Sequence, residues 1–218
     1  MSITTRFSEI VDNFNDCVYH ILGCGAIGSA AAMQLVRMGA EEFLLYDFDR
    51  VSVENIGVSQ YTVMDIHMNK TRALKKHMQN INPSAKITAI PNRFEFFEST
   101  GEKDILILAF DTMDARKQAV ITTLKNKDKP WLLIDGRMGA EHYQQYTLIN
   151  PTLKDYMKTW YSDEDGDPEP CNAKATAYCS NMSGSFIANQ IKKAVTDTPV
   201  NEEFFFNFPT LTLARKVK

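Results

Sequence analysis

Short apolar runs alternate with amphipathic stretches along most of the 218-residue chain. Several runs rich in β-branched, aromatic and leucine residues are predicted as strands, at residues 18–22, 43–46, 86–90, 105–110 and 131–134. Other stretches have helical spacing and are predicted as helices, at residues 27–38, 69–80, 113–125 and 182–195. This alternation is typical of βα units on a largely parallel sheet.

Helix stop signals and one strand of a different pattern complete the predicted fold. The first helix is expected to end at Gly39 and the second at Asn82-Pro83, because these residues interrupt helical backbone. Residues 143–149 alternate differently and are expected to pair antiparallel at an edge. The sequence therefore predicts an α/β fold, with a mostly parallel twisted sheet, helices on both faces and an antiparallel edge extension.

Two segments do not follow this alternation of strands and helices. Residues 154–170 include the acidic, turn-rich stretch SDEDGDPEP, and residues 154–180 are expected to form a mobile loop of the crossover type. The residues that follow are too few for a second domain of the usual size. Residues 200–218 are expected to form a tail, whose aromatic stretch 204–208 packs on the body of the domain or on a second subunit.

The composition limits the partners and the location that we expect. The chain is 44% apolar and 23% charged, and its formal net charge of −3 gives no electrostatic reason to bind nucleic acid or an anionic membrane. Its longest apolar runs are far shorter than the roughly 20 residues of a transmembrane helix. The N-terminal stretch lacks an apolar signal core. We therefore expect a cytoplasmic protein with no nucleic-acid and no membrane partner.

The cysteines and histidines show no metal-binding spacing. Cys17, Cys24, Cys171 and Cys179 include no CxxC pair, so a zinc site of four thiolates is not expected. Free thiols are expected in a reducing compartment. The histidines, His20, His67, His77 and His142, are expected to be structural or exposed.

A glycine-rich turn between the first strand and the first helix indicates a nucleotide site. In Gly23-x-Gly25-x-x-Gly28, the first glycine permits the tight turn, the second lets the backbone approach phosphate, and the third lets the helix pack close to the strand. The helix N-terminus offers free N–H groups to an anion. Asp47, at the end of the next strand, suits the hydroxyls of a ribose.

An acid at position 47 fits NAD and ATP equally well, so other residues must distinguish them. Lys70 lies at the start of the second predicted helix. A dehydrogenase needs no lysine there, whereas an ammonium group can neutralise a triphosphate as pyrophosphate departs. Taken alone, Lys70 is better interpreted as a solvated lysine on a helix.

Four motifs in continuous order carry a family resemblance. The stretches GCGAIGS, YDFDRVSVENIG, HMNKTRALKKHMQNINPSAKI and DILILAFDTMDARKQ resemble the ThiF/MoeB/HesA family of ATP-dependent adenylyltransferases, relatives of the ubiquitin-activating enzymes. The likeness covers residues 18 to about 150, with weaker traces as far as the helix near 195. It implies one Rossmann-like adenylation domain over residues 1–218. It also implies ATP and Mg²⁺ as cofactors, and an acyl-adenylate formed on the C-terminus of a small β-grasp protein, ubiquitin-like or sulfur-carrier.

The resemblance also implies roles for individual residues. Those expected to bind the nucleotide are Gly23, Gly25, Ala26, Ile27, Gly28, Asp47, Asp49, Asn55, Gln60 and Lys70. Those expected in catalysis are Lys70, Asp111, Arg6 and Cys171, with Asp111 also the expected magnesium ligand. The position of Asp111 also supports this role independently of the resemblance, because ligands bind outside the carboxyl ends of strands and a hard cation prefers carboxylate oxygen. The alternative for Asp111 is an N-cap of the following helix.

One position departs from the family pattern. Val58 stands where the family has an arginine that reaches the phosphates, and Gln60 matches the next family residue only with a one-residue insertion. A missing guanidinium removes a bidentate phosphate clamp. Arg6 resembles the arginine that family dimers donate to the partner's site, which implies a homodimer. Alternatively, a guanidinium within the chain fills the gap, the candidates being Arg50, Arg72 and Arg137.

Alternatives to an active adenylating enzyme also remain open. Cys171, in the stretch DPEPCNAKATAYCSN, is either a nucleophile that forms a covalent adduct or a packing thiol, and Lys174 would lower its pKa if the two side chains face each other. Without the family arginine, the chain is alternatively a non-catalytic ATP-binding partner of an activating-enzyme complex. A third possibility is an NAD-dependent oxidoreductase, which the set Asp47, Asn55, Lys70 and Asp111 disfavours.

Overall fold

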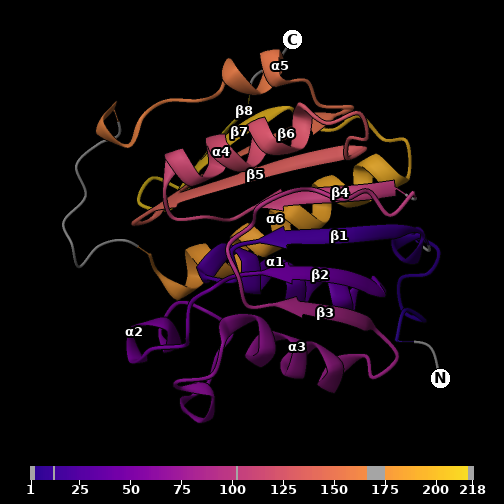
Figure 1. Cartoon of the computed structure of the whole chain (residues 1–218), viewed down its shortest axis with the longest axis vertical. Coiled ribbons are helices and arrows are strands. Elements are labelled where there is room, and N and C mark those ends of the chain that lie inside the picture. Colours follow the sequence, from indigo (N-terminus) through magenta and orange to yellow (C-terminus); the bar gives the residue numbers. More distant parts are fainter. Residues whose placement is uncertain (1–2, 12, 102, 166–174, 216–218) are drawn as a thin grey trace.

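A single mixed sheet organises the part of the chain that the computed structural model describes, namely residues 3–11, 13–101, 103–165 and 175–215. Within these residues the sheet has eight strands in the order β3-β2-β1-β4-β5-β6-β7-β8 (Figure 1). The strands are β1 (Cys17–Leu22), β2 (Glu42–Tyr46), β3 (Lys86–Ile90), β4 (Lys103–Leu108), β5 (Leu132–Gly139), β6 (His142–Ile149), β7 (Glu203–Asn207) and β8 (Thr212–Arg215).

The sheet has a parallel part and an antiparallel part. Strands β1 to β5 pair in parallel, with β1 in the middle between β2 and β4. All six residues of β1 are buried, because both faces of this strand are covered. Strands β5 to β8 pair antiparallel and extend the sheet on one side. The predicted α/β fold with an antiparallel edge extension is confirmed.

Helices cover both faces of the sheet. Helices α1 (Ala26–Arg37), α3 (Lys70–Ile81) and α6 (Ala177–Val195) pack on one face, and α4 (Met113–Leu124) and α5 (Leu153–Met157) pack on the other. Short helical segments complete the described structure: α2 (Val53–Ile56) and the 3-10 turns η1 (Phe14–Asp16), η2 (Val63–Asp65) and η3 (Asp163–Asp165). None of the helices in the described ranges is long and apolar enough to cross a bilayer.

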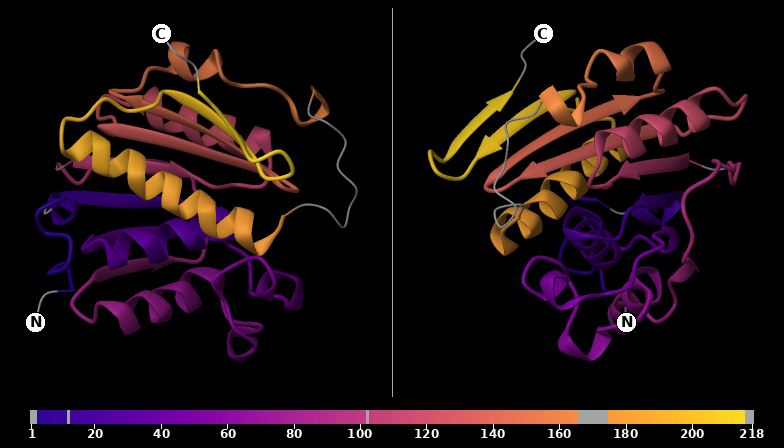
Figure 2. Two further views of the ribbon diagram at one scale, coloured as in Figure 1. Left: turned by 180° about the vertical axis from the view of Figure 1, so that it is seen from behind. Right: turned by 60° about the vertical axis from the view of Figure 1, so that its left-hand side comes forward.

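Helices α1 and α6 pack against each other on the same face of the sheet (Figure 2). A Cβ added to Gly184 of α6 would lie 2.6 Å from the carbonyl carbon of Ala30 in α1. A glycine facing small alanines lets the two backbones approach, and this contact fixes α6 against the helix that follows the glycine turn. The first turn of α6 therefore lies close to the candidate site described below.

Several predicted boundaries shift for reasons that involve distant residues. Strand β5 runs on to Gly139 rather than ending at residue 134, because it pairs with β6 along its whole length. Part of the segment 154–180 that was expected to be a loop is helical: α5 begins at Leu153, and α6 begins at Ala177 rather than at residue 182. The aromatic tail is strand β7, paired to β6 of the same chain.

Candidate functional site

Several of the predicted site residues lie at one edge of the parallel sheet. Gly23 follows β1, Asp47 follows β2, and Asp111 lies a few residues after β4, so all three stand at the carboxyl ends of neighbouring strands (Figure 1). Ligands of open α/β sheets bind at such an edge. We call the group Gly23–Gly28, Asp47, Asp49, Lys70 and Asp111 the glycine-loop site.

The three glycines of the loop have separate physical roles. Gly23 has a φ of +93°, and a Cβ there would lie 2.6 Å from the carbonyl oxygen of Ala109, so both its conformation and its surroundings require glycine. A Cβ on Gly28 would lie 1.8 Å from the carbonyl oxygen of Gly23, so the first turn of α1 packs directly on the loop. A Cβ on Gly25 would meet nothing within 4 Å. The loop is therefore tight on its inner side and open at Gly25.

Asp47 ties the glycine loop to the end of β2. Its Oδ2 accepts a hydrogen bond of 2.7 Å from the backbone N–H of Cys24, and its Oδ1 accepts one of 2.8 Å from the N–H of Asp49. Burial raises the pKa of Asp47 above its usual value, while Lys70 and these two N–H groups oppose the rise. The carboxylate is thus fixed in place and retains lone pairs that can accept hydroxyl donors.

Lys70 is a nearly buried cation beside this carboxylate. It is the first residue of α3, and its Nζ lies 2.8 Å from Oδ2 of Asp49, whose side chain is half exposed. The hydroxyl of Tyr61 donates to the carbonyl oxygen of Cys24 at 2.5 Å, and it also lies 3.3 Å from the carbonyl oxygen of Lys70. Burial raises the pKa of Tyr61, which keeps the phenol a donor. Tyr61 therefore links the loop to the start of α3, a role that the sequence did not suggest.

Asn55 and Gln60 form hydrogen bonds with other residues of the chain. Asn55 Oδ1 accepts hydrogen bonds from the N–H and the hydroxyl of Ser52, which caps the short helix α2. The backbone N–H of Gln60 donates to Ser29 Oγ at 3.1 Å, and its Nε2 donates to Asn181 Oδ1 on α6 at 2.7 Å. These bonds attach the segment between α2 and η2 to α1 and α6. Val58 lies half-buried in the same segment and offers no charge.

Asp111 is exposed at the end of β4 and does not cap the next helix. The N-cap of α4 is Thr112, whose side chain accepts from the N–H of Ala115 at 3.3 Å. The described residues bring together no group of three or more His, Cys, Asp or Glu side chains that would hold a metal ion. A single carboxylate fits Mg²⁺ nevertheless, because that ion is held through one or two carboxylates together with substrate phosphates and water.

The candidate arginines differ in their exposure and in their hydrogen-bond partners. Arg6 is exposed in the N-terminal turn, and Arg72 is exposed on α3. Arg50 donates from Nη1 to the carbonyl oxygen of His67 at 2.6 Å. Arg137 is buried and bound to Asp135 and to the carbonyl oxygen of Thr159. Arg137 is therefore not available as a phosphate clamp, which corrects that alternative.

The candidate cysteine lies outside the described residues, as does Lys174. The other cysteines, Cys17, Cys24 and Cys179, are buried. Burial raises the pKa of Cys24, in the glycine loop, and raises that of Cys179 to about 11. Buried thiols with a raised pKa are poor nucleophiles.

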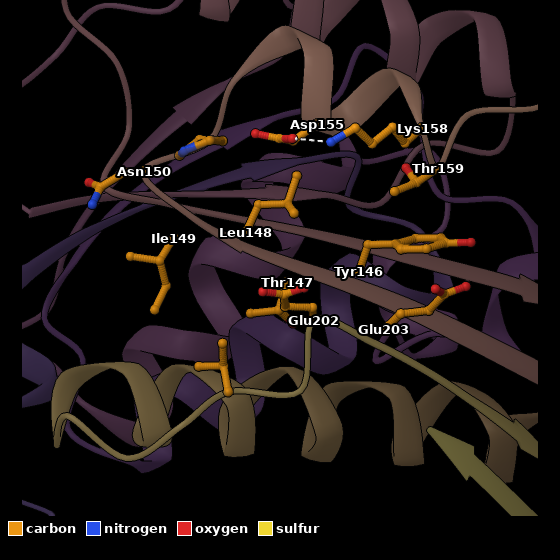
Figure 3. Close-up of a pocket in the computed structure, with 12 residues that line it drawn as sticks. Tyr146, Thr147, Leu148, Ile149, Asn150, Asp155, Lys158, Thr159, Glu202 and Glu203 are labelled. Atoms are coloured by element: carbon orange, nitrogen blue, oxygen red, sulfur yellow. Dashed lines mark hydrogen bonds and ion pairs between the residues drawn. The ribbon is translucent and has the colours of Figure 1, made fainter. Parts of the chain in front are cut away.

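A separate hollow of about 550 Å³ lies on the antiparallel part of the sheet (Figure 3). It is bordered by β6, by residues at and after α5, and by the segment before β7, including Leu148, Ile149 and Glu202. Its charged residues Asp155 and Lys158 form an ion pair of 2.6 Å. It contains none of the glycine-loop residues, and nothing in its lining points to a specific ligand.

Comparison with known proteins identifies relatives of the chain. The family described as the ThiF family matches residues 7–217. The ubiquitin-like modifier-activating enzyme 5 of Oryza sativa subsp. japonica is 36% identical over 154 residues, covering 69% of this chain and 33% of that protein. The ATP-dependent ubiquitin transferase-like protein Cap2 of Pseudomonas aeruginosa is 34% identical over 91 residues, covering 40% of this chain and 17% of that protein. The chain spans about a third of the length of the curated relatives it matches first.

Solved structures share the fold. MccB of E. coli, solved with ATP, has a TM-score of 0.69 and 15% identity, covering 95% of this chain and 65% of that chain. PaaA has a TM-score of 0.71 and 18% identity, covering 93% of this chain and 64% of that chain. These TM-scores establish a common Rossmann-like α/β fold, and identities this low show the fold alone.

The glycine loop yields a first prediction. Gly28→Ala should lower the free energy of unfolding by about 1 to 3 kcal/mol, because the new methyl group overlaps the backbone of Gly23. Gly25→Ala should change it by less than about 0.5 kcal/mol, since no atom of the protein occupies that space. Urea unfolding of both variants gives these values.

The matched variant separates folding from ligand binding. Gly25→Ala should weaken the binding of a nucleotide while the fold stays intact, because the methyl group occupies the space through which phosphate approaches. A Gly25→Ala protein that binds nucleotide as tightly as the unsubstituted chain would contradict the assignment of this loop.

Proposed function

The chain belongs to the ThiF family, and we propose that it is an ATP-dependent adenylyltransferase that activates a carboxylate. In this reaction a carboxylate oxygen attacks the α-phosphorus of ATP, and the bond from that phosphorus to the oxygen bridging to the β-phosphate breaks. An acyl-adenylate and pyrophosphate form. One observation carries the proposal: a single edge of the sheet brings together an open glycine loop, a fixed carboxylate, a cation and an exposed carboxylate.

Each residue of the glycine-loop site has a role in the proposed reaction. The backbone around Gly25 and the N-terminus of α1 bind phosphate. Asp47 accepts the ribose hydroxyls, and its fixed position sets the register of the nucleotide. Lys70 leaves its contact with Asp49 to meet the triphosphate charge. Asp111 would hold Mg²⁺, and the bound ion would supply positive charge next to the pyrophosphate group.

We propose a homodimer that supplies the guanidinium missing at position 58. Arg6 is exposed and can reach another subunit, whereas Arg137 is bound to Asp135. A two-fold interface is self-complementary, so each subunit would complete the site of its neighbour. This arrangement also explains how a chain with Val58 would retain catalysis.

The proposed acceptor is a small protein with a free C-terminus, either ubiquitin-like or a sulfur carrier, and the proposed location is the cytoplasm. The relatives are named for such partners: a ubiquitin-like modifier-activating enzyme and a ubiquitin transferase-like protein. If a covalent adduct forms, Cys171 is proposed to take the acyl group from the acyl-adenylate as a thioester, with release of AMP and of the thiol proton. Changing Cys171 should then remove the adduct and leave adenylate formation unaffected.

A second candidate function is supported by two observations. Val58 lies at the position of the family arginine, and the side chain of Lys70 is already paired with Asp49. Such a site would suit a non-catalytic partner that binds ATP without turning it over. The two proposals agree on ATP binding and differ on turnover.

The choice of nucleotide tests the premise that both proposals share. MgATP at about 100 times its Kd should raise the melting temperature by roughly 5 to 10 °C, and NADH should raise it much less. Lys70→Ala should reduce the shift by more than half because it removes the charge opposite the phosphates. Lys76→Ala, an exposed lysine on the same helix, is the matched control and should leave the shift unchanged. Tighter binding of NADH than of MgATP would exclude the adenylation proposal.

Subunit mixing tests the contribution of Arg6 across a dimer. Arg6→Ala and Lys70→Ala should each abolish most acyl-adenylate formation, measured by mass spectrometry of the acceptor. Coexpression of the two variants should restore about a quarter of the activity, because half of the dimers are mixed and each has one complete site. A monomer with full activity, or mixed dimers no more active than either variant alone, would refute the shared site.

A further inference from the structure

A buried carboxylate outside the glycine-loop site gathers four donors. Asp135 of β5 has no exposed surface. Its Oδ1 accepts from Nη1 of Arg116, and its Oδ2 accepts from Nε and Nη2 of Arg137, at 3.0 and 2.7 Å, and from the hydroxyl of Tyr156, at 3.1 Å. Burying such charges is expensive, and an apolar core of similar volume is often at least as stable. The cluster therefore calls for an explanation other than stability.

Arg116 connects this carboxylate to the backbone that leads to Asp111. Besides Asp135, its Nη1 contacts the carbonyl oxygen of Leu108 at 3.3 Å, and its Nη2 donates to the carbonyl oxygen of Phe110. Leu108 is the last residue of β4, and Phe110 directly precedes Asp111. One planar guanidinium thus fixes the backbone on both sides of Ala109.

The same backbone is confined from the other side by the glycine loop. The carbonyl oxygen of Ala109 lies so close to Gly23 that a Cβ there would approach it to 2.6 Å. The backbone between Leu108 and Phe110 is therefore held between Arg116 and the loop. Asp111 follows this clamped segment, and its position relative to the loop depends on both contacts.

Arg137 also binds the carboxylate of Asp135, but its other contacts are with a different segment of the chain. Its Nη1 donates to the carbonyl oxygen of Thr159 at 2.7 Å, and its guanidinium lies over the rings of Tyr146 and Tyr161. These contacts fix the chain after α5 rather than the end of β4. Arg137 and Arg116 are thus a natural pair for comparison, because both are buried and both bind Asp135.

We propose that Arg116 is a positioning residue for Asp111, and that Asp135 orients Arg116 for this task. The inference rests on the proposed function, in which Asp111 holds the magnesium that accompanies ATP. Lysine is a poor substitute at position 116, because an ammonium is a point charge and cannot bind a carboxylate and two carbonyl oxygens in one plane. Residues that orient a metal ligand typically contribute 10- to 100-fold to metal affinity or activity.

The test compares Arg116→Lys with Arg137→Lys in the full chain. ATP binding is titrated with Mg²⁺ by calorimetry, and binding without Mg²⁺ is measured in chelator. Arg116→Lys should raise the Mg²⁺ concentration for half-maximal effect by on the order of 10-fold, and should leave metal-free binding within about 2-fold. Arg137→Lys should leave both within about 2-fold. Equal Mg²⁺ shifts in the two variants, or none in Arg116→Lys, would overturn the inference.

A second variant covers the case in which Arg116→Lys does not fold. Arg116→Gln combined with Asp135→Asn removes one charge of each sign, so the net charge of the cluster is kept. This double variant should show the same Mg²⁺ shift, and an unchanged Mg²⁺ dependence would overturn the inference.

Asp111→Asn separates this inference from the proposed function. If Asp111→Asn leaves the Mg²⁺ dependence unchanged, the proposed metal role of Asp111 fails, and the inference fails with it. If Asp111→Asn shifts the dependence and Arg116→Lys does not, the inference alone fails.

Discussion

The close approach of helix α1 to the turn before it sets the geometry on which the site depends. A Cβ on Gly28 would lie 1.8 Å from the carbonyl oxygen of Gly23, so this contact requires glycine at position 28. This contact aims the first N–H groups of α1 at the space beside Gly25. Asp47 then fixes the loop against β2 through the N–H of Cys24. Backbone packing thus shapes the loop that we propose binds phosphate, before any charged side chain is considered.

Two buried side chains connect the backbone near the glycine loop to other parts of the glycine-loop site. On one side, Tyr61 joins the carbonyl oxygen of Cys24 to the start of α3, where Lys70 stands. On the other side, Arg116 joins Asp135 to the backbone before Asp111. The cation and the exposed carboxylate are therefore each positioned by a buried polar side chain. Under the proposed function, these contacts would position the triphosphate and its metal before the acceptor binds.

Local sequence signals predicted the fold and the centre of the site, and long-range contacts account for what they missed. Apolar runs and glycine spacing indicated the parallel strands and the loop, because both depend on neighbouring residues. Tyr61 and Arg116 carried no such signal, since an aromatic residue in a loop and an arginine in a helix acquire their roles only through distant carbonyl and carboxylate groups. The extra length of β5 likewise depends on pairing with β6. The sequence alone allowed Arg137 as a phosphate ligand, because its hydrogen bond to Asp135 is visible only in the structure.

The proposed transfer of an adenylyl group at this edge of the sheet is tested by isotope exchange. Labelled pyrophosphate is incubated with the protein, MgATP and a small β-grasp protein that ends in Gly-Gly, and the label in ATP is followed. Adenylyl transfer predicts exchange that requires both the acceptor and Mg²⁺ and that is lost in Asp111→Asn. Tight MgATP binding without exchange, for acceptors that a related activating enzyme does adenylate, would contradict it and favour the non-catalytic partner.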